Sequence, residues 1–117
     1  MIGVCIVTYN QEQYIRQCLD SVVMQQVDFD YEVIIGEDCS TDNTKKICRD
    51  YQRKDKRVVY IELEEKRYNG GTRNVGIAQA QGDYIIFIDS DDYIDSQGIE
   101  RLYKLAKKND SDIVTSS

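Results

Sequence analysis

The chain has 117 residues, of which 41% are apolar and 31% charged, a size and composition suited to one domain with a buried core. Its 15 basic and 21 acidic residues give a net charge of −6, which argues against binding nucleic acid through its phosphates. The sequence has no histidine, which excludes Ser-His-Asp catalysis and histidine-ligated metal sites, so metal binding falls to carboxylates that suit Mg²⁺, Mn²⁺ or Ca²⁺.

The first half of the chain predicts two strand–helix units. The apolar, β-branched run Ile2–Thr8 is typical of a strand that is covered on both faces. Asn10 then resembles a helix N-cap, and the apolar spacing after it predicts a helix that ends near Gln26. Residues 31–36 predict the second strand, and a polar turn leads from them into a second helix.

The second half continues the same alternation. Residues 58–63 predict a third strand, and the charged run 64–67 has no periodicity and is interpreted as a surface loop. A short helix is expected over residues 72–81, followed by a fourth buried strand at 84–88. A last helix and a fifth strand at 112–115 complete the pattern.

This alternation predicts an α/β fold for residues 1–117, taken as a single domain. We expect an open, mostly parallel, Rossmann-like sheet with helices on both faces and right-handed crossovers. Two of the four cysteines, Cys5 and Cys18, are interpreted as small buried hydrophobic residues in a reducing compartment. The sequence shows no signal peptide and no membrane span, so we expect a cytoplasmic chain that reaches the inner membrane face only through further sequence.

Polar side chains follow three of the predicted strands, where ligands of open parallel sheets bind. If the first strand lies between the second and the fourth, the three sets meet at one edge of the sheet. The Asp-x-Asp spacing places Asp89 and Asp91 on one side of a short extended segment, where a divalent cation would relieve their repulsion and grip a diphosphate. Such residues are also ordinary caps and turn formers, and that alternative stays open. The three sets are Thr8, Tyr9 and Asn10; Glu37 and Asp38; and Asp89, Asp91 and Asp92.

Four stretches in this order resemble the family 2 glycosyltransferases of the GT-A fold. They are IVTYN at 6–10, EDCSTDNT at 37–44, RNVGI at 73–77 with GDY at 82–84, and DSDDY at 89–93. The resemblance covers nearly the whole chain and implies the nucleotide-diphospho-sugar-binding domain of an inverting glycosyltransferase in polysaccharide biosynthesis. It also implies Mn²⁺ or Mg²⁺ as cofactor, a UDP-sugar as the favoured donor, and a glycan or lipid-linked acceptor.

The resemblance implies a donor-binding role for each matched residue. Thr8 and Tyr9 would line the base pocket, and Asp38 would accept a hydrogen bond from the base. Arg73 and Asn74 match an Arg-Asn pair near the nucleotide, where an arginine suits a diphosphate.

The metal site and two departures from the family pattern follow from the same comparison. Asp89 would lie beside the ribose or sugar, and Asp91 would hold the metal together with Asp89. Asp92 would lie near the metal without binding it directly. Glu37 stands where the family has aspartate, and Cys39 stands where it has glycine. The family pattern therefore does not fix the geometry of the base pocket in this chain.

No catalytic base is assigned. The family places it well downstream of the Asp-x-Asp motif, whereas Asp95 lies too close to that motif and Asp112 leads a strand. We therefore expect the base beyond Ser117, in an acceptor-binding half, and expect these 117 residues alone to bind the donor without transferring the sugar.

Two other classes of protein share features with this sequence. A phosphatase or phosphotransferase of the haloacid-dehalogenase type would use Asp89 as nucleophile, and it stays as the runner-up. A receiver-type module needs paired acids after the first strand, where this chain has Tyr9 and Asn10, and is rejected. A sheet edge near Ser117 could pair with another copy, so a homo-oligomer stays open.

Overall fold

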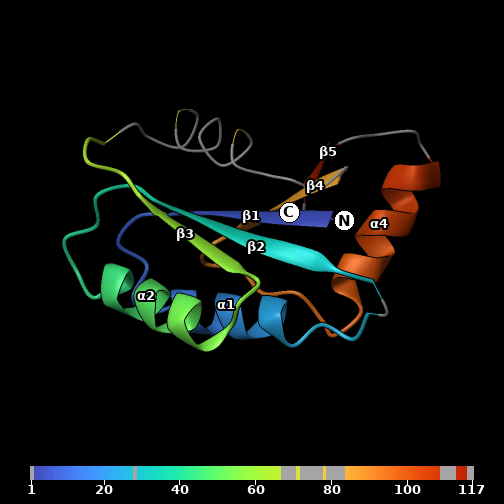
Figure 1. Cartoon of the computed structure of the whole chain (residues 1–117), viewed down its shortest axis with the longest axis horizontal. Coiled ribbons are helices and arrows are strands. Elements are labelled where there is room, and N and C mark those ends of the chain that lie inside the picture. Colours follow the sequence, from blue (N-terminus) through green and yellow to red (C-terminus); the bar gives the residue numbers. More distant parts are fainter. Residues whose placement is uncertain are drawn as a thin grey trace.

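Five parallel strands form one sheet in the order β3-β2-β1-β4-β5 (Figure 1). The computed structural model describes residues 2–27, 29–66, 71, 78, 84–108 and 113–115, and side chains no further than residue 105. The α/β class and the parallel sheet are confirmed, and β1 lies between β2 and β4 as the convergence of the polar residues requires. The strands are β1 (Ile2–Thr8), β2 (Tyr31–Glu37), β3 (Val58–Glu62), β4 (Tyr84–Asp89) and β5 (Ile113–Thr115).

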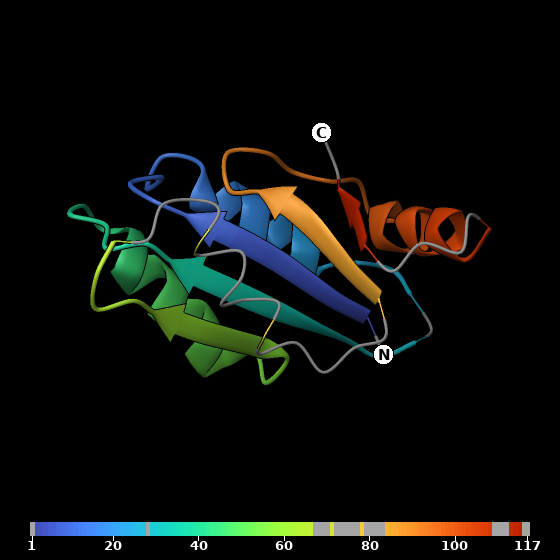
Figure 2. The ribbon, with the colours of Figure 1, turned by 90° about the horizontal axis from the view of Figure 1, so that it is seen from above.

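Three helices of the described chain pack against the sheet: α1 (Ile15–Val23), α2 (Thr44–Lys54) and α4 (Gly98–Lys108). Helices α1 and α2 run side by side beneath the sheet, and α4 lies toward the end where the strands begin (Figures 1 and 2). All three contribute to one hydrophobic core, which includes Leu19 of α1, Ile47 of α2 and Ile99 of α4. The helix expected over residues 72–81 lies outside the described residues.

The core follows from the register of the strands. Parallel partners share a face, so Val4 of β1 lies level with Val33 of β2 and Ile86 of β4, and all three belong to the helix-covered core. On the other face Cys5 and Phe87 are also buried. Strands buried on both faces explain why their sequences are apolar throughout rather than alternating.

The start of α1 corrects one prediction. Asn10 is not its N-cap, because the helix begins at Ile15 without a side-chain cap. Asn10 instead adopts φ 50°, a left-handed conformation that asparagine tolerates better than most residues. Its Oδ1 accepts a hydrogen bond from Thr41 N–H at 2.7 Å, and its own N–H donates to Ser40 Oγ at 2.8 Å. Asn10 therefore ties the end of β1 to the loop between β2 and α2.

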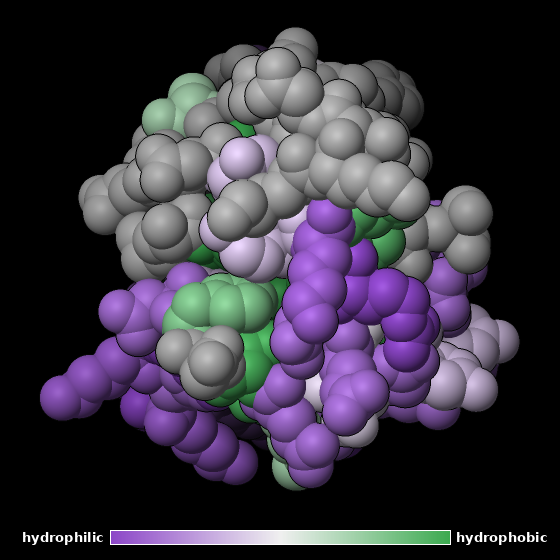
Figure 3. All heavy atoms as spheres, turned by 90° about the vertical axis from the view of Figure 1, so that its right-hand side faces the viewer, coloured by the Kyte–Doolittle hydropathy of each residue, from purple (hydrophilic) through white to green (hydrophobic). Residues whose placement is uncertain are grey.

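Aromatic side chains pack together at the end of the molecule where the strands begin. Tyr103 of α4 lies 5.2 Å from Phe29 and 5.3 Å from Tyr84, measured between ring centroids. Seen from this end, the described surface is mostly hydrophilic with small apolar patches (Figure 3). Among the helices of the described residues, none has the length and apolar character needed to cross a membrane.

Candidate functional site

Three strands end at the same edge of the sheet, on the left in Figures 1 and 2. The pairing places Thr8 of β1 beside Glu37 of β2, and Val7 of β1 beside Asp89 of β4. The polar residues after these strands, which are far apart in sequence, are thereby brought together as the strand order predicts.

A cavity of about 400 Å³ opens at this edge. Tyr9, Asp89 and Asp91 line it together with Val7, Gln11 and Ser90. The carboxylate-bearing residues Asp89 and Asp91 are both exposed, so their charges face the space rather than the core. The cavity thus combines one aromatic ring with two nearby acids.

A buried acid lies beside this cavity, at the end of β2. Asp38 is only 1% exposed, and its Oδ2 is 3.2 Å from the Nζ atom of Lys66. The same Nζ lies 3.3 Å from the centroid of the Tyr9 ring. Because Tyr9 also lines the cavity, the buried carboxylate, the ammonium group and the acidic cavity form one continuous site.

The two departures from the family pattern shape the turn after β2. Glu37 is fully buried, and its Oε1 and Oε2 accept hydrogen bonds from Ser40 N–H at 2.7 Å and Cys39 N–H at 3.1 Å. Cys39 has φ 63°, in the left-handed region that favours glycine. Glu37 therefore stabilises the turn from inside, and Cys39 holds a strained backbone conformation next to Asp38.

Thr8 lies deeper than its neighbours. It is buried, and its Oγ1 has no hydrogen-bond partner among the residues that the structure describes. Side chains alternate along a strand, so Val7 rather than Thr8 shares the face of Asp89 and lines the cavity. Contact between Thr8 and a nucleotide stays a prediction.

Helix α1 holds the segment that follows β4. The Cys18 thiol lies 3.5 Å from the carbonyl oxygen of Asp89, and Ser21 Oγ accepts a hydrogen bond from Ile94 N–H at 3.2 Å. Burial, with smaller contributions from Asp92, Asp91 and Asp89, raises the pKa of the Cys18 thiol to about 12. The thiol is therefore protonated at neutral pH and is a donor toward the Asp89 carbonyl.

The acidic pair is a suitable but incomplete ligand set for a divalent cation. Within the described ranges no three or more histidine, cysteine, aspartate or glutamate residues gather into a metal-binding group. Mg²⁺ is usually held by one or two protein carboxylates, with substrate phosphates and water completing its shell. Asp89 and Asp91 on one cavity wall fit that arrangement. Asp92 instead accepts a hydrogen bond from Tyr93 N–H at 2.8 Å, as a turn former does.

Arg73 and Asn74, which the sequence predicts to bind the nucleotide, lie outside the described residues. Lys66, for which the sequence predicts no role, lies at the centre of the site. Lys66 belongs to a charged run without periodicity, and no sequence signal distinguishes it from its neighbours. Only the fold brings it to Asp38, 28 positions away in the chain.

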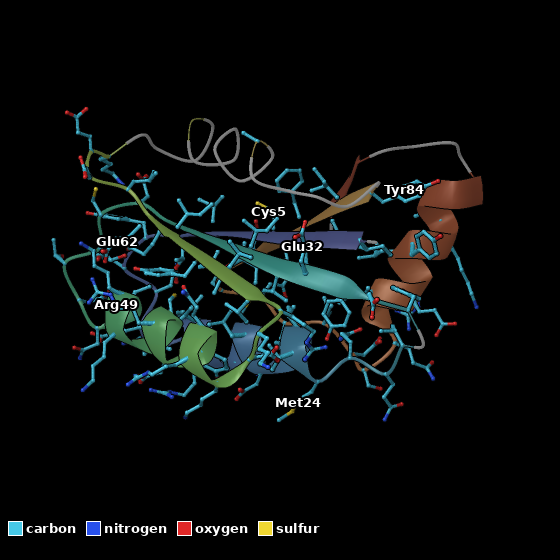
Figure 4. The ribbon with its side chains drawn as sticks, in the orientation of Figure 1. Cys5, Met24, Glu32, Arg49, Glu62 and Tyr84 are labelled. Carbon is cyan, nitrogen blue, oxygen red and sulfur yellow. The ribbon has the colours of Figure 1, made fainter. Side chains whose placement is uncertain are left out.

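A second hollow of about 370 Å³ lies between α2 and β3. Arg49 and Glu62, which line it, form an ion pair with each other (Figure 4). Its lining, which also includes Gln52, Arg53 and Tyr60, contains no pair of carboxylates. The edge with Tyr9, Asp89 and Asp91 is therefore the better candidate for a nucleotide–metal site.

A comparison with protein families decides between the chemistries that this edge allows. The model of glycosyl transferase family 2 matches residues 3–117. The chain belongs to this family. Its relatives in glycosyl transferase family 2 are transferases, and this match does not favour the phosphatase alternative with Asp89 as nucleophile.

Curated relatives of the chain are also glycosyltransferases by name. The chain is 44% identical over 114 residues to a poly(ribitol-phosphate) β-glucosyltransferase of Bacillus spizizenii, covering 96% of this chain and 18% of the relative. It is 34% identical to the poly(ribitol-phosphate) β-N-acetylglucosaminyltransferase TarS of Staphylococcus aureus, covering 96% of this chain and 20% of TarS. The chain thus spans about a fifth of the length of these relatives.

Solved structures confirm the GT-A fold. S. aureus TarS 1–349 in complex with UDP-GlcNAc is similar with a TM-score of 0.79 and 35% identity, over 92% of this chain and 31% of that one. The mannosyltransferase PcManGT of Pyrobaculum calidifontis, in complex with GDP-Man and Mn²⁺, has a TM-score of 0.71 and 25% identity, over 79% of this chain and 28% of that one.

Proposed function

We propose that this chain binds the nucleotide-diphospho-sugar donor of a metal-dependent, inverting glycosyltransferase. The observation that carries the proposal is the cavity at the carboxyl ends of β1 and β4, where Tyr9 lies with Asp89 and Asp91 and is linked through Lys66 to Asp38. An aromatic face, a buried acceptor and two exposed acids match the base, ribose and diphosphate of one ligand.

The base would lie against Tyr9. Its ring N–H would donate to Asp38. Because Asp38 is buried, a base without an N–H at this position would leave the carboxylate without a donor and would bind more weakly. A UDP-sugar is the favoured donor, because S. aureus TarS, which shares the fold, forms complexes with UDP and with UDP-GlcNAc. Thr8, Arg73 and Asn74 are proposed to complete the nucleotide contacts.

Asp91 and Asp89 would hold Mn²⁺ or Mg²⁺, with Asp89 also near the ribose or sugar. PcManGT, whose solved complex contains Mn²⁺ and GDP-Man, supports a divalent ion at such an edge. When bound, the ion supplies positive charge that stabilises the departing nucleoside diphosphate. The chain's own part would be to present the exposed carboxylates of Asp89, at the end of β4, and of Asp91, in the turn after it, to the ion that binds the diphosphate.

Transfer would proceed to a hydroxyl of a glycan or lipid-linked acceptor in polysaccharide biosynthesis. Two relatives act, by name, on poly(ribitol-phosphate), which supports a polymeric acceptor. No residue of this chain is assigned as the general base, so we propose donor binding as the activity of these 117 residues by themselves.

Calorimetric titration of UDP into the protein tests the proposal. We expect binding in Mn²⁺ that is lost in EDTA, and an affinity at least tenfold lower in Asp91→Asn, because a metal ligand is removed. Asp95→Asn is the matched control, since Asp95 is exposed and pairs with Arg101 outside the cavity. If folded protein in Mn²⁺ binds none of UDP, GDP and dTDP, the edge is not a nucleotide site.

A further inference from the structure

The position of Lys66 raises a conflict with nucleotide binding. Its ammonium nitrogen lies 3.3 Å above the centroid of the Tyr9 ring and 3.2 Å from Asp38 Oδ2. These are the two groups proposed to stack on the base and to accept its ring N–H. Lys66 therefore makes, within the protein, both contacts that a nucleobase would make.

A base and the ammonium group cannot share this place. Ring atoms in van der Waals contact lie about 3.5 to 4.0 Å apart, so a base stacked over the centre of the Tyr9 ring would occupy the layer in which the Lys66 nitrogen lies. The Lys66 side chain is 31% exposed, so it has a route to solvent, whereas the Asp38 side chain at 1% does not. Displacement would therefore move Lys66 rather than Asp38.

We propose that Lys66 is an internal occupant of the nucleobase position, which a donor nucleotide must displace. This inference rests on the proposed donor-binding function and adds a control element to it. In the ligand-free state Lys66 gives the buried Asp38 carboxylate a counter-ion and covers one face of the Tyr9 ring. Only the fraction of molecules with Lys66 displaced is competent to bind, so the measured affinity is lowered by that fraction.

The proposal predicts the sign of a mutational effect. Lys66→Met keeps an apolar stem but removes the charge that holds it on Tyr9 and Asp38, so we expect uridine to bind about three- to tenfold more tightly. Lys66→Arg keeps a cation that stacks on aromatic rings and pairs with carboxylates, so its affinity for uridine should stay within about twofold of the wild type.

The matched control is Lys45→Met. Lys45 has a similar exposure, 33% against 31%, and also pairs with an acid, Glu62 at 3.9 Å, but it lies on α2. Lys45→Met removes one positive charge, as Lys66→Met does, but at a position away from Tyr9. It should therefore leave the affinity for uridine unchanged. Uridine is the main probe because it has no phosphate, so a direct attraction between Lys66 and the diphosphate does not enter the measurement. UDP with Mn²⁺ is titrated in parallel.

The outcomes separate this inference from the proposed function. Tighter uridine binding in Lys66→Met alone supports displacement. Equal or weaker uridine binding overturns it, and weaker UDP binding with unchanged uridine binding would make Lys66 a phosphate ligand instead. If neither uridine nor UDP binds to the folded wild type or to any variant, the inference is overturned, whereas the proposed function fails only if GDP and dTDP also do not bind in Mn²⁺.

A second measurement does not depend on affinity. With ¹³C-labelled lysine, the Lys66 ε-methylene resonance should be shifted upfield by the Tyr9 ring in ligand-free protein, and its absence in Lys66→Met assigns it. Saturating uridine should return the resonance toward the position of exposed lysines. A Lys66 signal that remains upfield at saturation would show that base and ammonium group coexist, and would overturn the inference.

Discussion

The side-chain amide of Gln25 donates from Nε2 to the carbonyl oxygen of Asp95, 2.6 Å away. Its Oε1 accepts a hydrogen bond from Ile99 N–H at 2.9 Å, so one side chain joins the end of α1 to the start of α4. Within α1, the Cys18 thiol contacts the Asp89 carbonyl at the end of β4, and Ser21 Oγ accepts the hydrogen bond from Ile94 N–H beyond it. The loop that carries Asp91 is therefore supported from the helix layer beneath the sheet.

Gln25→Ala should destabilise the protein by about 1 to 3 kcal/mol, because it leaves the buried Ile99 N–H without its partner. The Asp95 carbonyl loses one hydrogen bond but still accepts one from Gly98 N–H at 3.0 Å. Urea unfolding at pH 7 measures the change in the free energy of unfolding. Gln26→Ala, at the exposed neighbouring position, should stay within about 0.5 kcal/mol of the wild type. Equal losses at the two positions would show that the Gln25 hydrogen bonds contribute nothing particular.

The left-handed conformation of Cys39 makes a prediction about backbone strain. Cys39→Gly relieves that strain but loses the Sγ hydrogen bond to the Leu63 carbonyl at 3.3 Å, so its stability should lie within about 1 kcal/mol of the wild type. Cys39→Val is β-branched and should lose about 1 to 2 kcal/mol. Thermal unfolding compares the two variants, and a valine variant as stable as the glycine variant would contradict the assigned conformation.

The thiols should differ in reactivity. Burial is the main reason that the pKa values of Cys18 and Cys48 are raised to about 12, so about one molecule in 10⁴ carries either thiolate at pH 8. Cys39 is partly exposed. Iodoacetamide at pH 8 followed by peptide mass spectrometry should find Cys39 modified first and Cys18 and Cys48 protected until the protein is unfolded. Alkylation of Cys18 as fast as Cys39 would contradict its burial.

The Asp55–Arg57 pair predicts a pH-dependent contribution to stability. The side-chain hydrogen bond from Arg57 is the main cause that holds the pKa of Asp55 below its ordinary value. A depressed carboxyl pKa stabilises the fold above the unfolded value of about 3.9, and the contribution is lost as pH falls through the folded pKa. Asp55→Asn should therefore cost about 1 kcal/mol or less at pH 7, since the pair is partly exposed, and the difference should shrink as the pH falls and the Asp55 carboxyl of the folded protein becomes protonated.

Urea unfolding at several pH values measures that difference. Asp30→Asn removes an acid of the same kind at an exposed position, and serves as the control. A cost of Asp55→Asn that is the same at pH 7 and at the lowest pH at which the protein folds would show that the ion pair is not its origin.

Strand positions followed closely from the sequence. The prediction for β1 matches the observed Ile2–Thr8, and the limits of β2 and β3 each differ by one residue at the carboxyl end. Strands buried on both faces have apolar runs that local sequence reveals directly. The beginning of α1 was missed because Asn10 uses its capping groups on Thr41 and Ser40, which are distant in sequence. An isolated capping pattern does not show which partner its side chain will take.

The sequence by itself determined where the strands lie and that Tyr9, Asp38, Asp89 and Asp91 follow their carboxyl ends, because periodicity and turn chemistry are local. Only the tertiary structure decided that β1 separates β2 from β4, that Asp38 is buried while Asp89 and Asp91 are exposed, and that Lys66 lies between Asp38 and Tyr9. Strand order and burial arise from packing between segments far apart in the chain. The same packing gives a lysine from an unpatterned charged run its place on the Tyr9 ring, and no local pattern encodes that contact.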